Sequence, residues 1–231
     1  AWPLPQSPDD LVRRRRAIEA WSALNFGWLG RSPDHLATAL SGLMMGHDVM
    51  AQHDARRAAA FRDYFAYARD RDLFVTYVIQ NPQADKSKSA SSQARDLVLH
   101  AVDEDADGIT VSGAKMLGTS SVMADEIFVG NIQPLKAAEG AYALSFAMPM
   151  ATPGIVLLSR RSYEAGVTTA WDYPLSSRFD ENDAVVVFDQ VKVPWERVFV
   201  HGDVDAARTQ WHGTPTHVYQ NYQSQIRLAV K

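Results

Sequence analysis

Apolar residues recur at helical spacing through the first part of the chain. Ser7 to Asp10 has the features of a helix start: serine as the N-cap, proline in the first turn and acidic residues facing the positive end of the helix dipole. The apolar residues that follow fall near one helical face: Leu11, Ile18, Trp21 and Leu24. Gly27 ends the pattern, so the spacing predicts a helix between these limits.

The start signal returns at Ser32-Pro33-Asp34, ahead of a second predicted helix. Its apolar face consists of Leu36, Leu40, Leu43 and Met44. A third helix is predicted from about Val49 to Arg69, with Phe61, Phe65 and Ala68 facing inward. Residues 1–72 are therefore predicted to be α-helical.

The hydrophobic period changes at Leu73, where LFVTYVI is short, β-branched and aromatic. A polar loop from Asn81 to Gln93 follows. The segments Leu97–Val102 and Ile109–Leu117 flank the turn-forming DEDADG, which predicts a hairpin. Further strands are predicted at Glu126–Ile132, Ala141–Met148, Ile155–Leu158 and Ala184–Val193, and Thr216–Lys231 reads as the opening of another helix. The order predicts an α+β fold.

The apolar run Val185 to Phe188 is continuous rather than alternating, which favours a strand that is covered on both faces. Pro194 cannot donate to a sheet, so we expect this strand to end near Val193. The polar residues that crowd the segment before it are Asp172, Arg178, Asp180, Glu181 and Asp183. Paired charges there could fix a loop or meet a polar ligand.

Composition excludes several classes of function. A net charge of −4 over 231 residues gives no basic surface for nucleic acid, and Arg13 to Arg16 is read as a solvated helix face. No apolar run reaches the roughly 18 residues that span a bilayer, and no signal-peptide pattern is seen, so we expect no membrane partner. The chain has no cysteine, which fits a cytoplasmic setting. The histidines lack tight ligand spacing, so no metal site is predicted.

Four motifs occur in order along the chain: FGWLGRSPDH from Phe26, VIQNPQADKSK from Val78, GITVSGAKMLGTSS from Gly108 and DYPLSSRFDENDAVVVFDQVKVPWERVF from Asp172. Together they resemble the 4-hydroxyphenylacetate 3-monooxygenase family. These proteins are the oxygenase components of two-component, reduced-flavin-dependent phenol hydroxylases. Family members are longer at both ends.

The resemblance implies an acyl-CoA dehydrogenase-like architecture. Residues 1–72 would be the end of an N-terminal α-helical domain, 73–202 an antiparallel β-barrel-like middle domain, and 203–231 the start of a C-terminal helical bundle that builds a homotetramer. It also implies FAD, used as FADH2 from a separate NAD(P)H:flavin reductase, with O2 as co-substrate. The reaction implied is hydroxylation of a phenolic small molecule through a flavin C4a-hydroperoxide.

The resemblance assigns catalytic roles to four residues. Arg31 stands where a family arginine reaches the flavin and the phenol oxygen; the alternative is a surface arginine that pairs with Asp34. His35 and Tyr77 stand where hydroxyphenylacetate enzymes usually carry tyrosine and histidine respectively, so the two donor types are exchanged. Tyr77 could instead be a core strand residue, and His35 a solvent-facing helix residue. His217 stands near a family histidine that deprotonates the substrate.

Cofactor contacts are implied for Arg31, Gln83, Lys86, Thr119 and Ser120. Gln83 and Lys86 occupy positions where the family places glutamine and a basic residue against the flavin; the alternative is a solvated polar loop. Thr119 and Ser120 match a hydroxyl pair that contacts flavin, and without the resemblance GTSS would be read as a turn.

Two other classes of function stay open. One is a related enzyme that acts on a CoA thioester, although zero cysteines argue against the iron–sulfur-dependent 4-hydroxybutyryl-CoA dehydratase. The other is a non-catalytic interaction fragment.

Overall fold

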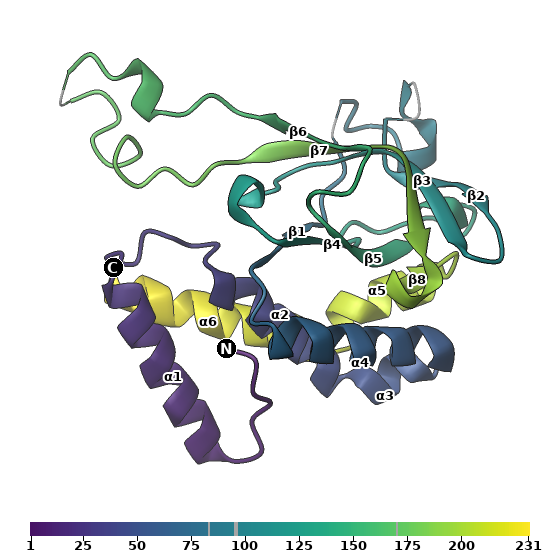
Figure 1. Ribbon diagram of the computed structural model, residues 1–231, viewed down its shortest axis with the longest axis horizontal. Helices are drawn as coiled ribbons and strands as arrows, with labels where there is room; N and C mark the ends of the chain where they lie inside the picture. The colour runs from purple at the N-terminus through teal and green to yellow at the C-terminus, as the bar shows by residue number, and fades with distance from the viewer. Residues whose placement is uncertain (83, 95–96, 170) are drawn as a thin grey trace.

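The computed structural model describes residues 1–82, 84–94, 97–169 and 171–231. Helices form one layer and two β-sheets form the others (Figure 1). The helices are α1 (Pro8–Ala23), α2 (Pro33–Met45), α3 (His47–Ala51), α4 (Ala55–Asp70), α5 (Val204–His212) and α6 (Thr216–Val230). The strands are β1 (Val75–Val78), β2 (His100–Glu104), β3 (Gly108–Lys115), β4 (Glu126–Val129), β5 (Leu144–Pro149), β6 (Ile155–Ser159), β7 (Ala184–Pro194) and β8 (Val198–His201).

The described strands make two separate four-stranded sheets, in the orders β1-β4-β5-β8 and β2-β3-β7-β6. The β1–β4 pair is parallel and the other neighbours are antiparallel. The predicted α+β class is correct at this level. The predicted barrel-like closure is wrong for the described part of the chain, because no ladder joins the edges of the two sheets.

Two hydrophobic cores separate the three layers. The β1-β4-β5-β8 sheet is the inner one, and its Val75, Phe128 and Phe199 pack against α2 and α4. Val78 and Ile127 of the same sheet face the outer sheet, β2-β3-β7-β6. Successive strand residues point to opposite faces, so β1 contributes to both cores. Tyr77 consequently faces the helices, while Thr76 faces the other way.

Several local predictions need correction. The helix expected from Val49 to Arg69 is two helices, because the Asp54 side chain accepts from the N–H groups of Arg56 and Arg57 and starts α4 anew. Burial along β7 alternates, so its apolar run is not covered on both faces. The apolar stripe of α1 is largely exposed: only its Ile18 is buried.

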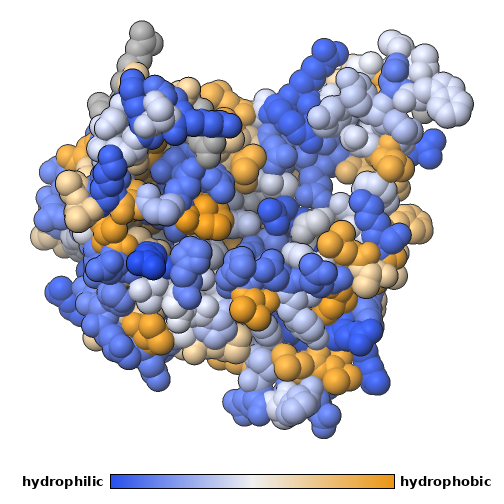
Figure 2. Space-filling view, turned by 180° about the vertical axis from the view of Figure 1, so that it is seen from behind, coloured by the Kyte–Doolittle hydropathy of each residue, from blue (hydrophilic) through white to orange (hydrophobic). Residues whose placement is uncertain are grey.

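The surface does not gather its apolar residues into one face. Figure 2 shows hydrophobic residues in separate patches among hydrophilic ones on the side seen there. No helix in the described ranges is both long and apolar enough to cross a membrane. Across the same ranges, no cluster of three or more histidine and acidic side chains has the arrangement of a metal site.

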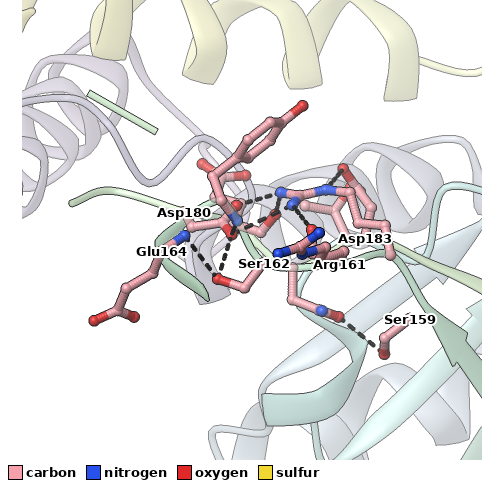
Figure 3. A network of polar contacts seen from close by, with 11 residues as sticks. Ser159, Arg161, Ser162, Glu164, Asp180 and Asp183 are labelled. Atoms are coloured by element: carbon pink, nitrogen blue, oxygen red, sulfur yellow. Dashed lines mark hydrogen bonds and ion pairs between the residues drawn. The ribbon is translucent and has the colours of Figure 1, made fainter. Parts of the chain in front are cut away.

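The segment between β6 and β7 projects past the helical layer (Figure 1). Arg160 pairs with Asp180 at its base and holds the pKa of that carboxyl below its usual range, and Ser162 donates to the same carboxylate at 3.1 Å. Figure 3 shows Asp180, Ser162 and Asp183 in this network. This polar network fixes the return of the chain into β7.

Candidate functional site

Three elements meet at the candidate site: the start of α2, strand β1 and the middle of α6. The start of α2 carries His35, β1 carries Tyr77, and α6 places Gln220 and Gln223 opposite them. The α2 and α6 helices pack closely at Gly42, where a Cβ would lie only 2.5 Å from Thr216 Cα. A larger residue at Gly42 would therefore push α6 away from His35.

His35 is the centre of this cluster and is only 2% exposed. Its Nε2 lies 2.9 Å from Arg31 Nη1 and 2.8 Å from Gln220 Nε2, and its Nδ1 lies 3.1 Å from Gln223 Oε1. The open alternative of a solvent-facing helix residue does not describe His35. Its ring instead connects the start of α2 to α6.

Tyr77 and Arg31 face each other across the cluster. The Gln220 amide also donates to the Tyr77 hydroxyl at 3.1 Å, and the Arg31 guanidinium lies 5.6 Å from the centre of the Tyr77 ring. The His35 and Tyr77 rings are 5.8 Å apart. Arg31 is exposed, and Asp34 pairs with Arg227 at 2.8 Å rather than with Arg31. The N–H groups that Arg31 does not use on His35 are thus available to a ligand.

Burial sets the protonation of His35. The pKa of His35 is lowered to about 4, mainly by loss of hydration and secondly by the Arg31 charge. The Gln223 hydrogen bond and the Asp34 charge act in the opposite sense, and Arg227 adds to the lowering. His35 is therefore a neutral imidazole at neutral pH.

We expect His35 to make the fold acid-sensitive. Between about pH 4 and 6.5 the unfolded chain binds a proton at His35 that the folded chain does not, so stability falls as pH is lowered through this window. The full effect, reached below about pH 4, is roughly 3 kcal/mol. Urea unfolding of the 231-residue chain at several pH values measures it, with His35→Gln as the comparison. Equal pH slopes for the two proteins in this window would contradict the assignment.

Thr119 and Ser120 are tied to β1 and to residues 180–183 through two sets of contacts. Thr76 donates to the Thr119 carbonyl at 2.6 Å, which joins the GTSS turn to β1 next to Tyr77. The Ser120 N–H donates to the Asn182 carbonyl at 2.7 Å, and the Gly30 N–H donates to the neighbouring Glu181 carboxylate. Residues 180–183 therefore bridge the turn to the segment that carries Arg31.

Aromatic contacts fix the residues just before α2. Trp28 stacks on Phe179 with ring centres 5.4 Å apart, and Lys231 Nζ lies 3.4 Å from the centre of the Trp28 ring. Asp180, which follows Phe179 directly in the sequence, pairs with Arg160. The segment between β6 and β7 thus positions the backbone just before Arg31.

The remaining predicted residues lie apart from the cluster. Lys86 is exposed in a turn of the loop that follows β1, and His217 is exposed on α6, where Asn221 Nδ2 lies 3.4 Å from its Nε2. His217 precedes Gln220 by one helical turn. Gln83 lies outside the described residues.

Lys115 is a residue that the sequence reasoning missed. It is fully buried at the end of β3, and its ammonium donates to Asn81 Oδ1 at 2.8 Å, the Gly130 carbonyl at 3.0 Å and Asn131 Oδ1 at 2.6 Å. Burial lowers the pKa of Lys115 to about 7. The lysine joins the start of the loop bearing Lys86 to the end of β4.

Comparison with known proteins decides the family. Residues 1–200 match the family model described as 4-hydroxyphenylacetate 3-hydroxylase N terminal, HpaB_N. The chain belongs to this family. The HpaB resemblance inferred from the four motifs is thereby confirmed.

Relatives of this HpaB-family chain share both its sequence and its fold. It is 36% identical over 230 residues to the 4-hydroxyphenylacetate 3-monooxygenase oxygenase component of Geobacillus sp. (strain PA-9), covering 98% of this chain and 46% of that protein. It is 44% identical over 205 residues to the 4-nitrophenol 2-monooxygenase oxygenase component of Rhodococcus sp, covering 87% and 38%. The chain spans less than half the length of these relatives.

A solved structure of the HpaB oxygenase component, complexed with FAD and 4-hydroxyphenylacetate, superposes with a TM-score of 0.89 at 34% identity. The superposition covers 100% of this chain and 47% of that chain. The arrangement of one helical layer and two sheets is thus that of the matching part of an HpaB oxygenase.

Proposed function

We propose that the whole protein to which this HpaB-family chain contributes is the oxygenase component of a two-component phenol monooxygenase. It would use FADH2 delivered by a separate NAD(P)H:flavin reductase, and O2, to hydroxylate a phenolic substrate. The observation that carries the proposal is the cluster of Arg31, His35 and Tyr77, which the fold assembles from segments far apart in sequence. Identity to phenol monooxygenase components supports the same chemistry.

The cluster suits the oxygen of an ionised phenol. Gln220 donates to the Tyr77 hydroxyl, so the Tyr77 proton stays available for a ligand, and Arg31 has further N–H groups to offer. Charge-assisted donors of this kind bind a phenolate and hold its electron-rich ring in place. The Nε2 lone pair of His35 already accepts from Arg31 and Gln220, so His35 orients donors rather than accepting the substrate proton.

The residues around the cluster also fit a flavin. Among the residues that the structure describes, the buried Ser120 hydroxyl has no hydrogen-bond partner, which is unusual for a polar atom and suits a contact to a cofactor atom. Thr119, Arg31 and Lys86 add a hydroxyl and two cations for the ring and the phosphates of FAD. Bound reduced FAD would supply the activation of O2. The role of Gln83 remains a prediction.

A base for the substrate proton is proposed at His217. Its imidazole is exposed and lies one helical turn before Gln220 on α6. Histidine is the side chain that most often serves as a general base in proton transfer.

The larger organisation is likewise proposed from the family. Residues 1–72, 73–202 and 203–231 would belong to a helical, a β and a second helical domain of an acyl-CoA dehydrogenase-like protein, and the whole protein would be a cytoplasmic homotetramer.

The test is product formation from a panel of phenols by the whole protein with chemically reduced FAD and oxygen. We expect ortho-hydroxylated products, with at least one of 4-hydroxyphenylacetate and 4-nitrophenol consumed. CoA thioesters incubated with oxidised FAD and an electron acceptor are the control for the alternative chemistry. Turnover of a thioester without any catechol would replace this proposal by the alternative.

A further inference from the structure

A buried polar chain leads from Arg227 to the candidate site. Arg227 Nη2 donates to Asp34 Oδ1 at 2.8 Å, and Gln223 Nε2 donates to Asp34 Oδ2 at 3.0 Å. A carboxylate only accepts hydrogen bonds. Asp34 therefore fixes the Gln223 amide with its nitrogen toward Asp34 and its oxygen toward His35.

The orientation of Gln223 determines the tautomer of His35. Gln223 Oε1 lies 3.1 Å from His35 Nδ1, so the hydrogen bond requires a proton on Nδ1. A neutral imidazole carries one N–H, which leaves Nε2 as an acceptor. On that side the guanidinium of Arg31, which only donates, lies 2.9 Å away. The acceptor-only Asp34 and the donor-only Arg31 thus require the same tautomer from opposite ends.

We propose that Gln223 is a positioning residue that locks His35 as the Nδ1–H tautomer and thereby aims Arg31 and Gln220 at the ligand side of the cluster. The lock is built to be rigid: Gln223 has no exposed surface, and His35 and Arg227 are only 2% and 3% exposed. Water therefore cannot reach His35 Nδ1 to replace the hydrogen bond to Gln223.

The lock has a consequence for what the site can bind. One N–H of the Gln220 amide donates to His35 Nε2 and the other to the Tyr77 hydroxyl, 3.1 Å away. Tyr77 thus accepts from Gln220 and keeps its O–H for a ligand, so Tyr77 and Arg31 both present donors to that ligand. In the opposite tautomer, His35 Nε2–H would oppose Arg31 and turn the Gln220 amide around. This part rests on the proposed function: the Gln223 lock would make the site select the ionised form of a phenol.

The experiment is nuclear magnetic resonance of the 231-residue chain with ¹⁵N-labelled histidine at pH 7. The His35 signals are assigned by their loss in His35→Gln. We expect a protonated Nδ1 and an unprotonated Nε2. Gln223→Met removes the acceptor beside Nδ1, so part of the His35 population is expected to move to the Nε2–H tautomer. Gln225→Met, at an exposed site on the same helix, is the matched control.

Two results would overturn the proposal: an Nε2–H tautomer in the parent, or an unchanged Nδ1–H tautomer in a folded Gln223→Met variant. In the whole protein, kcat/KM for phenol hydroxylation is expected to fall about tenfold in Gln223→Met and to stay at the parent value in Gln225→Met, because small misplacements of donors are costly. If the parent itself hydroxylates no phenol, the proposed function fails while the ¹⁵N result still decides the role of Gln223.

Discussion

Replacement of Arg31 by alanine is expected to lower kcat/KM for phenol hydroxylation by the whole protein about 100-fold, which corresponds to roughly 3 kcal/mol of transition-state stabilisation. The physical reason is the loss of a preorganised cation whose orientation is held by the 2.9 Å contact to His35. Because Arg31 is exposed, its removal leaves no cavity and no buried unpaired charge in the core. Steady-state kinetics together with thermal unfolding of the same variant measure both effects.

Two controls make the Arg31 result specific. Arg62→Ala removes an exposed arginine on α4 that pairs with Asp63, and it is expected to leave the kinetics unchanged. Arg31→Lys keeps the charge but loses the planar array of donors, so an intermediate rate is expected. An Arg31→Ala protein with parent stability and activity within threefold of the parent would remove Arg31 from the site.

Replacement of Lys115 by alanine is expected to lower the free energy of unfolding of the 231-residue chain by about 3 kcal/mol. The change empties the buried volume of the side chain and leaves Asn81, Gly130 and Asn131 without their shared donor. Removing the ammonium also removes the desolvation cost of burying it, which offsets part of this loss. Urea unfolding measures the effect as a lower midpoint with an unchanged slope.

Lys86→Ala is the matched control for Lys115, since Lys86 is an exposed lysine on the loop that Lys115 anchors. Its effect on stability is expected to stay within about 0.5 kcal/mol. A Lys115→Ala midpoint equal to that of Lys86→Ala would mean that the three contacts of Lys115 do not support the fold.

The sequence predicted those elements whose start or turn is set by neighbouring residues. The Ser7 side chain accepts from the Asp10 N–H and starts α1, as the sequence indicates, and the β2–β3 hairpin forms around the expected turn. Strand β8 and helix α5 were missed. The run in β8 is short and is selected by pairing with β5, and α5 starts at an Asp203 cap without a long apolar stripe.

The arrangement of the sheets depends on contacts that no local pattern contains. The parallel pairing of β1 with β4 and the separation of the strands into two sheets join segments about 50 residues apart, such as Val75 with Glu126. A pattern of alternating strands fits a barrel and two packed sheets equally well, so the predicted closure could not be tested from sequence.

The same distinction separates the predicted and missed site residues. Arg31, His35 and Tyr77 were located through motifs, and the structure brings them together. Gln220 and Gln223 lie on a helix with no chemical motif, and only the packing of α6 against α2 gives them a role. Lys115 reads as an ordinary strand end, because nothing in its neighbours shows that its amine is buried.

The most direct test of the site is the ionisation of bound 4-nitrophenol, followed by the absorbance of its phenolate in the whole protein without flavin. A cluster that presents donors stabilises the anion, so the pKa of the bound phenol is expected to lie about 1 to 3 units below that in solution. The shift should shrink in Arg31→Ala and in Tyr77→Phe. A bound phenol that ionises at or above its solution pKa would contradict the account.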